Sequence, residues 1–217
     1  MLYIVATPIG NLKDITFRAI DTLREVDLIL AEDTRRTGIL SKRWMIKDKK
    51  MLSYNDANKT RRTQEAIKLL REGKDIALVS DSGTPGISDP GFYLIREAIK
   101  YNIKISPIPG ACALISALVC SGLPTDKFEF YGFIPKKESQ KKKFFENLVD
   151  KTVVFYESPY RIVKTLEIMN NVIPDKKIVI ARELTKKFEE FIRGTVKGVY
   201  RKLKDKKIKG EVVVVTH

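Results

Sequence analysis

The sequence is poor in the residues that build metal sites and disulfide frameworks. Its 217 residues include two cysteines and one histidine, His217, which is the last residue. So few Cys and His side chains exclude a zinc cluster of the usual kind, and we expect no metal. Cys112 and Cys120 lie eight positions apart in what reads as one helix, so we do not expect a disulfide between them.

Long apolar runs are also missing. No stretch approaches the ~20 apolar residues that a transmembrane helix needs. The first ten residues, MLYIVATPIG, contain neither a basic leader nor a cleavage pattern of small residues. We therefore expect a cytoplasmic protein without a membrane segment. The G-x-G-x-x-G loop of dinucleotide-binding folds is absent after the first expected strand.

Positive charge is abundant. The formal net charge is +14, from 41 Lys and Arg against 27 Asp and Glu. Such an excess suits a polyanionic partner, RNA above all, although a general bias toward lysine would give the same number. The densest basic stretch is PKKESQKKK at 135–143, which is either an RNA-contacting surface or a solvated helix end.

Strands and helices alternate through the first 122 residues, which predicts an α/β domain with a largely parallel sheet. The apolar run Ile76–Val79 reads as a buried strand and is followed by the loop SDSGTPGISDPG at 80–91. Asp89 and Pro90 read as the start of the next helix. Two more expected strands end in loops with Pro and Gly together, at 7–11 and 107–111. Three such loops at one sheet edge predict a ligand pocket, whereas one alone would be an ordinary turn.

The turn-like segment LPTD at 123–126 is the expected domain boundary. We therefore expect an N-terminal α/β domain at 1–122 and a C-terminal α/β domain at 123–217. In the second, the apolar run Val212–Val215 reads as a buried strand that completes the sheet.

Eight motifs in order carry a resemblance to a known family. They are ATPIGNLKDIT (6–16), AEDTRRT (31–37), SDSGTPGISDPG (80–91), PIPGACALISAL (107–118), SGLPTDKF (121–128), FYESPYRI (155–162), ARELTKKFEE (181–190) and GEVVVV (210–215). Together they span the chain and resemble the tetrapyrrole-methylase-like family. Cys112 stands where the family pattern would lead us to expect Ser.

The resemblance implies two α/β domains with S-adenosyl-L-methionine in the cleft between them, in a homodimer. It points to the branch that 2′-O-methylates a cytidine ribose in 16S rRNA of the small ribosomal subunit. By motif, the expected cofactor-binding residues are Pro8, Asp81, Gly83, Thr84, Gly110, Ala111, Cys112, Tyr156 and Leu184. In this reading Gly83 and Gly110 leave room for the cofactor to lie against the backbone.

Transfer of a methyl group to a ribose hydroxyl is helped by a general base. The candidate catalytic residues are Asp33, Glu183 and Lys186. Lys186 would need a lowered pKa to accept a proton, but as a cation it can stabilise a developing alkoxide or hold a phosphate. Asp33 and Glu183 can equally be locked in ion pairs with Arg35 and Arg182, so the base stays unassigned. Two other functions remain open: a methyltransferase acting on a tetrapyrrole precursor, and a non-catalytic ribosome-assembly factor.

Overall fold

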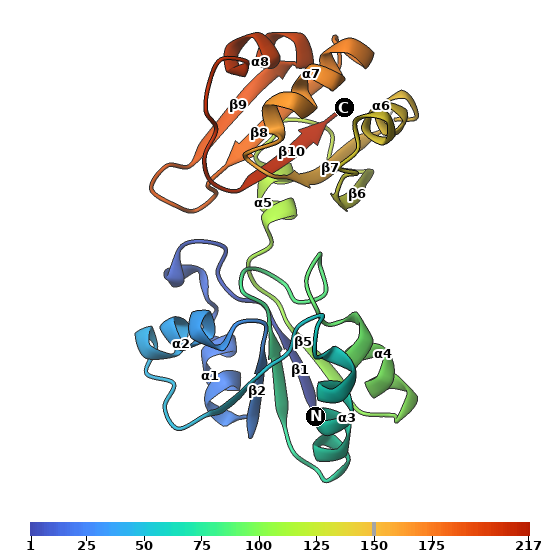
Figure 1. The fold of residues 1–217 in the computed structure, drawn as a ribbon. Helices are drawn as coiled ribbons and strands as arrows, with labels where there is room; N and C mark the ends of the chain where they lie inside the picture. The colour runs from blue at the N-terminus through green and yellow to red at the C-terminus, as the bar shows by residue number, and fades with distance from the viewer. Residues whose placement is uncertain (149–150) are drawn as a thin grey trace. The chain divides into compact units, whose positions relative to one another are not determined.

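The computed structural model describes residues 1–148 and 151–217. The chain divides into two compact units, Met1–Cys112 and Ala113–His217 (Figure 1). No helix in these two described stretches has the length and apolar character that crossing a membrane requires. Each unit is built around its own five-stranded sheet.

The first unit is a parallel sheet with helices on both faces. Its strands are β1 (Leu2–Val5), β2 (Leu28–Ala31), β3 (Lys50–Ser53), β4 (Ile76–Val79) and β5 (Ile105–Ile108), in the order β3-β2-β4-β1-β5. Its helices are the 3₁₀ turn η1 (Leu12–Asp14), α1 (Phe17–Glu25), α2 (Thr34–Arg43), α3 (Lys59–Arg71) and α4 (Phe92–Lys100). Every strand pairing in this sheet is parallel, as the alternation predicts.

Successive residues of each strand point to opposite faces of the sheet, so the strands contribute to two hydrophobic cores. In β4, Ala77 and Val79 join the cluster under α1 and α2, whereas Ile76 and Leu78 join the cluster under α3 and α4. Figure 1 shows the two helix pairs on opposite sides of this sheet. A strand buried on both faces is apolar throughout, and all four residues of β4 are buried.

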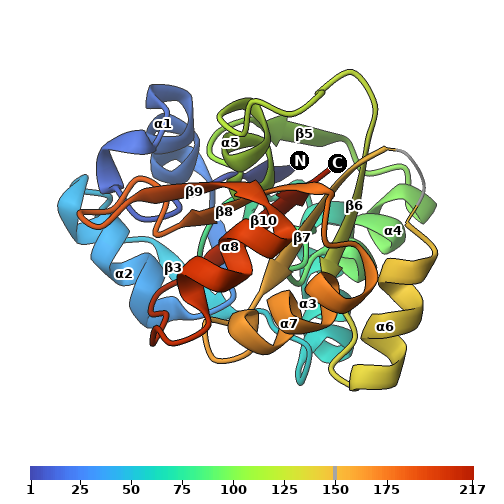
Figure 2. The same cartoon turned by 90° about the horizontal axis from the view of Figure 1, so that it is seen from above.

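The second unit has a mixed sheet. Its strands are β6 (Phe128–Phe133), β7 (Thr152–Glu157), β8 (Lys177–Arg182), β9 (Glu190–Thr195) and β10 (Val212–Thr216), in the order β6-β7-β10-β8-β9. Its helices are α5 (Ala113–Val119), α6 (Glu138–Glu146), α7 (Ile162–Val172) and α8 (Val196–Leu203). The expectation that the terminal strand completes this sheet is confirmed, since β10 pairs with both β7 and β8 (Figure 2).

Three helices cover one face of this second sheet. Phe145 of α6, Leu166 of α7 and Val199 of α8 share a core cluster with Val212 and Val214 of β10. The alternate β10 residues point to the other face, where α5 packs against β7 and β10. Because α5 packs in this way, the second unit begins at Ala113 instead of at 123, where the turn residues had suggested the boundary.

Two local expectations differ from the structure. Helix α4 begins at Phe92 after Gly91, not at Asp89 and Pro90. Lys141 of the basic stretch is buried at 2% exposure. Its ammonium group lies 2.7 Å from the Glu157 carboxylate, so Lys141 belongs to the core of the second unit and not to an RNA-contacting surface. The neighbouring Lys142 and Lys143 are exposed.

Candidate functional site

Three loops meet at the carboxyl edge of the first sheet. They follow β1, β4 and β5, which are neighbours in the order β4-β1-β5. The Thr7 N–H donates to the Gly83 carbonyl oxygen over 2.8 Å, and the Gly83 N–H donates back to the Thr7 oxygen over 3.0 Å. The Thr84 hydroxyl donates to the Ala111 carbonyl oxygen over 3.2 Å. These bonds join the three Pro- and Gly-containing loops, at the edge where open α/β sheets bind ligands.

The structure thus gathers the expected cofactor residues of the first unit at one edge. These are Pro8, Asp81, Gly83, Thr84, Gly110, Ala111 and Cys112, all of which follow strands β1, β4 or β5. Cys112 and Cys120 form no disulfide, and they lie just before and just after α5 instead of within one helix.

The local structure explains why glycine occupies positions 83 and 110, independently of any ligand. Gly83 has a φ of +87°, which a residue with a side chain rarely adopts. A Cβ on Gly110 would lie 3.0 Å from the Ala6 Cβ. The close packing of the β5 loop on the end of β1 therefore favours glycine at 110, whether or not a ligand lies against it.

Carboxylates from the residues that follow β2 and β4 lie at the same edge of the sheet. Asp81 follows β4, and its carboxylate accepts the Asp33 backbone N–H over 2.9 Å. Glu32 follows β2, and its carboxylate accepts the Asp81 backbone N–H over 3.2 Å. Arg36 lies 3.5 Å from the other Asp81 oxygen. This reciprocal pairing holds the ends of two adjacent strands together and fixes the direction of each carboxylate.

Asp33 is the N-cap of α2. Its carboxylate accepts the Arg35 backbone N–H over 2.9 Å and lies 2.6 Å from the Arg35 guanidinium. The hydrogen bonds from the Arg35 side chain and then its backbone lower the pKa of Asp33 to about 2. Asp33 is therefore ionised at neutral pH and is a weak proton acceptor.

Asp89 was expected to be a helix cap, and no pattern in the sequence indicated another role. Burial raises its pKa to about 6, with the negative charges of Glu32 and Asp81 contributing and a hydrogen bond from Ser80 opposing. A carboxyl group that titrates near neutral pH beside a ligand-binding edge is a candidate for proton transfer.

In the second unit, Glu183 and Lys186 form a cluster with Glu211. The Lys186 ammonium lies 3.0 Å from a carboxylate oxygen of Glu183 and 3.0 Å from one of Glu211. Burial lowers the pKa of Lys186, but hydrogen bonds to Glu211 and Glu183 outweigh it and leave the pKa raised. Lys186 is thus a cation, and the lowered pKa that a role as base requires is not found.

Glu183 is held by the same cluster and by the backbone. Burial raises its pKa, but hydrogen bonds from the Glu211 N–H and from Lys186 outweigh it and leave the pKa lowered. Arg182, the alternative partner considered from the sequence, pairs with Glu190 at 3.1 Å. A Cβ on Gly210 would lie 2.3 Å from the Glu183 side chain, so any larger residue there must displace that side chain.

The backbone around Leu184 is unusual. Glu183 and Thr185, on either side of it, have φ values of +51° and +63°. Each such residue costs on the order of 1–3 kcal/mol, and strain of this kind concentrates at functional sites. The Leu184 side chain is buried at 7% exposure. The strained backbone therefore supports the expectation that this turn binds a ligand.

Tyr156 lies on β7, next to an ion network that sequence reasoning missed. Its ring packs edge-on against Phe130 and Phe133, with centroids 5.1 and 5.6 Å away. The next residue, Glu157, has a fully buried carboxylate that pairs with Lys141 and Arg161, each at 2.7 Å. This network fixes the end of β7 from which Tyr156 projects.

The hydrogen-bonding groups of these residues fit S-adenosyl-L-methionine. The first edge offers backbone groups of three loops and carboxylates that can accept bonds from a ribose or an amine. Residues 1–148 and 151–217 contain no group of three His, Cys, Asp or Glu side chains placed to hold a metal ion.

Comparison with known proteins gives a consistent result. The family model for tetrapyrrole (corrin/porphyrin) methylases matches residues 1–200. A relative from Hydrogenobaculum sp., named ribosomal RNA small subunit methyltransferase I, is 51% identical over 99% of this chain and 94% of its own length. A relative of the same name from Thermotoga maritima is 47% identical over 99% of this chain and 96% of its own.

Solved structures share the fold. The crystal structure of uroporphyrin-III C-methyl transferase from Thermus thermophilus, complexed with S-adenyl homocysteine, superposes with a TM-score of 0.65. It is 13% identical, and the match covers 99% of this chain and 96% of that one. Similarity at this level of identity establishes the two-unit α/β fold.

Proposed function

Because the chain belongs to the tetrapyrrole methylase family, we propose that it methylates a cytidine ribose of 16S rRNA at the 2′-oxygen, with S-adenosyl-L-methionine as the methyl donor. The observation that carries this proposal is the 45–51% identity over 99% of the chain to relatives named ribosomal RNA small subunit methyltransferase I. The chain is thus a methyltransferase, and rRNA of the small subunit is its substrate. The choice of a cytidine and of its 2′-oxygen comes from the motif resemblance.

The chain's own contribution is position and electrostatics. The cofactor supplies an electrophilic methyl group on a sulfonium, which an oxygen nucleophile attacks in line. The loops after β1, β4 and β5 are tied together by hydrogen bonds and so present a fixed set of backbone groups. Holding two reactants in such a frame is worth roughly 7–11 kcal/mol. By the motif resemblance, Pro8, Asp81, Gly83, Thr84 and the Gly110–Cys112 turn would contact the cofactor, as would Tyr156 and Leu184.

Asp89 would accept the proton of the ribose hydroxyl. Its pKa of about 6 leaves the carboxylate ionised at neutral pH yet basic enough to take a proton. Of the three residues selected from the sequence, Asp33 and Glu183 have lowered pKa values, and Lys186 is a cation. We assign Asp33 to capping α2, and Glu183 to holding Lys186. Lys186 would stabilise negative charge on the substrate.

A homodimer and a cytoplasmic location complete the proposal. A two-fold dimer is the expectation from the motif resemblance, and small-subunit RNA is found in the cytoplasm of bacteria. Light scattering should report about 50 kDa, twice the 24.8 kDa of one chain. A mass near 25 kDa at micromolar concentration would contradict the dimer.

Methyl transfer to purified small subunits tests the function. Subunits that lack the modification should incorporate label from S-adenosyl-L-methionine into 16S rRNA. A 2′-O-methyl group blocks alkaline cleavage on its 3′ side, so an alkaline ladder locates the nucleotide and separates ribose from base methylation. Label transferred to a tetrapyrrole precursor but not to RNA would favour the alternative enzyme. RNA binding with no transfer to either would favour an assembly factor.

A further inference from the structure

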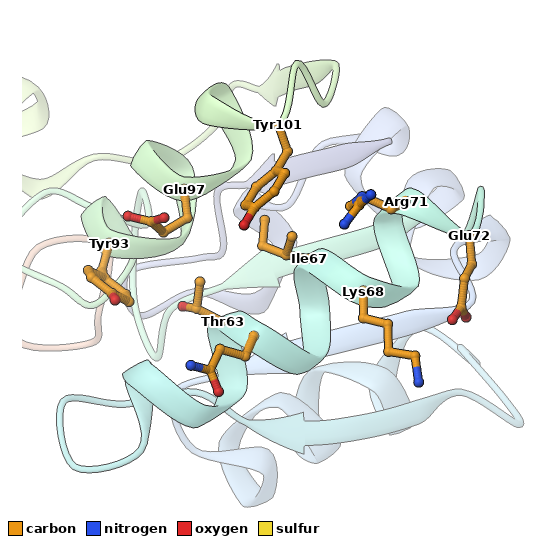
Figure 3. A pocket seen from close by; sticks show the side chains of 9 residues that line it. Thr63, Ile67, Lys68, Arg71, Glu72, Tyr93, Glu97 and Tyr101 are labelled. Carbon is orange, nitrogen blue, oxygen red and sulfur yellow. The ribbon is translucent and has the colours of Figure 1, made fainter.

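A groove between α3 and α4 lies on the outer face of the first unit. Its volume is about 590 Å³, and its walls include Ile67, Lys68 and Arg71 of α3 with Tyr93 and Glu97 of α4 and Tyr101 just after it. Figure 3 shows both tyrosine rings and Ile67 between the two helices. The groove therefore has aromatic and apolar surface at its centre and charged groups along its walls.

Arginines and aromatic rings are paired in this groove and on the adjoining surface of α4, where Phe92 and Arg96 lie outside the groove lining. The Arg71 guanidinium lies 5.4 Å from the centre of the Tyr101 ring. Arg96 lies 5.0 Å from the Tyr93 ring and 5.7 Å from the Phe92 ring. The Tyr101 side chain stays 51% exposed and Phe92 70% exposed, so the pairs leave aromatic surface open to solvent. An arginine stacked on an exposed ring is a platform on which an unpaired nucleobase stacks.

Positive charge accompanies these rings. Residues 59–74, which contain α3, hold six basic and two acidic side chains. Glu97 is neutralised by Lys100 at 2.9 Å and Arg96 at 3.5 Å. Within the described part of the chain, neither Lys68 nor Arg71 has a carboxylate partner within 4.0 Å. Both cations are therefore available to phosphate groups.

We propose that the α3–α4 groove binds unpaired nucleotides of the small-subunit RNA, with a base stacked at Tyr101 and Arg71 and phosphates near Lys68 and Arg71. The inference rests on the proposed function, because it assigns to the RNA substrate a second contact surface on the enzyme. An acidic peptide would use the cations alone, whereas aromatic and arginine surfaces together match single-stranded nucleic acid. The groove would thus strengthen substrate binding without touching the reacting atoms.

Variants of Tyr101 and Arg71 test this proposal. Tyr101→Ala should weaken binding to unmethylated small subunits, and to a fluorescein-labelled octamer of cytidine, by about 5- to 100-fold. Tyr101→Phe keeps the ring and should bind like the wild type. Arg71→Ala should reduce the slope of log K against log salt by about one. In steady-state methylation, both alanine variants should raise KM for small subunits while kcat and cofactor affinity stay unchanged.

Arg61→Ala is the matched control. Arg61 is on the same helix, is 67% exposed and carries the same charge, but it does not line the groove. The proposal would be overturned if Arg71→Ala and Arg61→Ala weakened RNA binding equally and Tyr101→Ala did not weaken it. RNA affinity would then depend only on the net charge of the protein. Altered self-association in sedimentation, with RNA affinity unchanged, would also overturn it and assign the groove to a second copy of the chain. A wild-type enzyme that methylates no RNA would instead contradict the proposed function.

Discussion

Replacing Lys141 by Met should strongly destabilise the second unit. The Lys141 side chain is 3% exposed, and its ammonium group lies 2.7 Å from the carboxylate of Glu157, whose side chain is fully buried. It also donates to the Thr165 hydroxyl. Methionine has nearly the same length and fills the same space, so the change removes mainly the charge and its hydrogen bonds. Breaking one side of a buried pair costs about 3–5 kcal/mol, because the partner charge stays buried.

The remaining partners of Glu157 place the expected loss in free energy of unfolding near the lower end of that range. Glu157 keeps the Arg161 guanidinium at 2.7 Å, the Ser158 N–H at 2.8 Å and the Thr165 hydroxyl at 2.7 Å. We therefore expect a loss of about 3 kcal/mol, which corresponds to a shift of ~1–3 M in the urea midpoint. Urea unfolding followed by far-UV circular dichroism measures it.

The pH dependence gives an independent check. Burial raises the pKa of Glu157, but hydrogen bonds from Lys141, Thr165 and the Ser158 N–H outweigh it, so the folded-state pKa is lowered. A lowered pKa stabilises the fold above the unfolded value of about 4.5, and this contribution is lost as the pH falls through the folded value. The difference in stability between wild type and Lys141→Met should therefore narrow in acid.

Two further variants make the test decisive. Lys142→Met removes the same charge from the same helix, but Lys142 is 64% exposed and 3.8 Å from Glu146, so its cost should stay below about 0.5 kcal/mol. Lys141→Met with Glu157→Leu removes both buried charges and should recover part of the loss. If Lys141→Met were as stable as Lys142→Met at neutral pH, the buried pair would not be a feature of the folded protein.

Three further changes test other parts of the site. Asp89→Asn should abolish the rise in methylation rate that we expect near pH 6. It should also stabilise the protein at pH 7.5 by on the order of 3 kcal/mol, because a folded-state pKa of about 6, raised from 3.8, means that folding disfavours the carboxylate above that pH. A pH–rate profile with unfolding curves checks both, and an unchanged profile would remove Asp89 as the base. Gly210→Ala should displace the Glu183 side chain, since a Cβ would lie 2.3 Å from it, and should weaken cofactor binding measured by calorimetry; unchanged affinity would separate this cluster from the cofactor. Lys142→Glu with Lys143→Glu should flatten the salt dependence of small-subunit binding and leave cofactor affinity unchanged; equal salt slopes would show that this helix lies away from the RNA.

Much of the first unit could be predicted from the chain because its signals are local. Four consecutive apolar residues at 76–79, followed by Pro- and Gly-containing turns, specify a doubly covered parallel strand and the loop after it. Either Asp14 or Thr16 could cap the helix that follows, and the structure has Thr16 as the N-cap of α1, where its side chain accepts the Ala19 N–H. The edge strand β9 and helix α8 were missed, because EFIRGT alternates weakly between apolar and polar residues, although β9 pairs with β8, the strand that precedes it in the chain.

The sequence by itself determined the alternation of strands and helices, the loops that form the ligand edge and the family to which the chain belongs. Those features follow from local periodicity, turn chemistry and ordered motifs. Only the tertiary structure decided which charged groups are buried and paired. Lys141 and Lys142 are neighbours in one basic run, yet one is in the core and the other in solvent. Likewise, Asp33 and Asp89 differ in pKa, about 2 against about 6, because one carboxylate has an arginine beside it and the other is buried near two carboxylates. A pKa depends on burial and on neighbours brought together by folding, so the roles of identical side chains separate only in three dimensions.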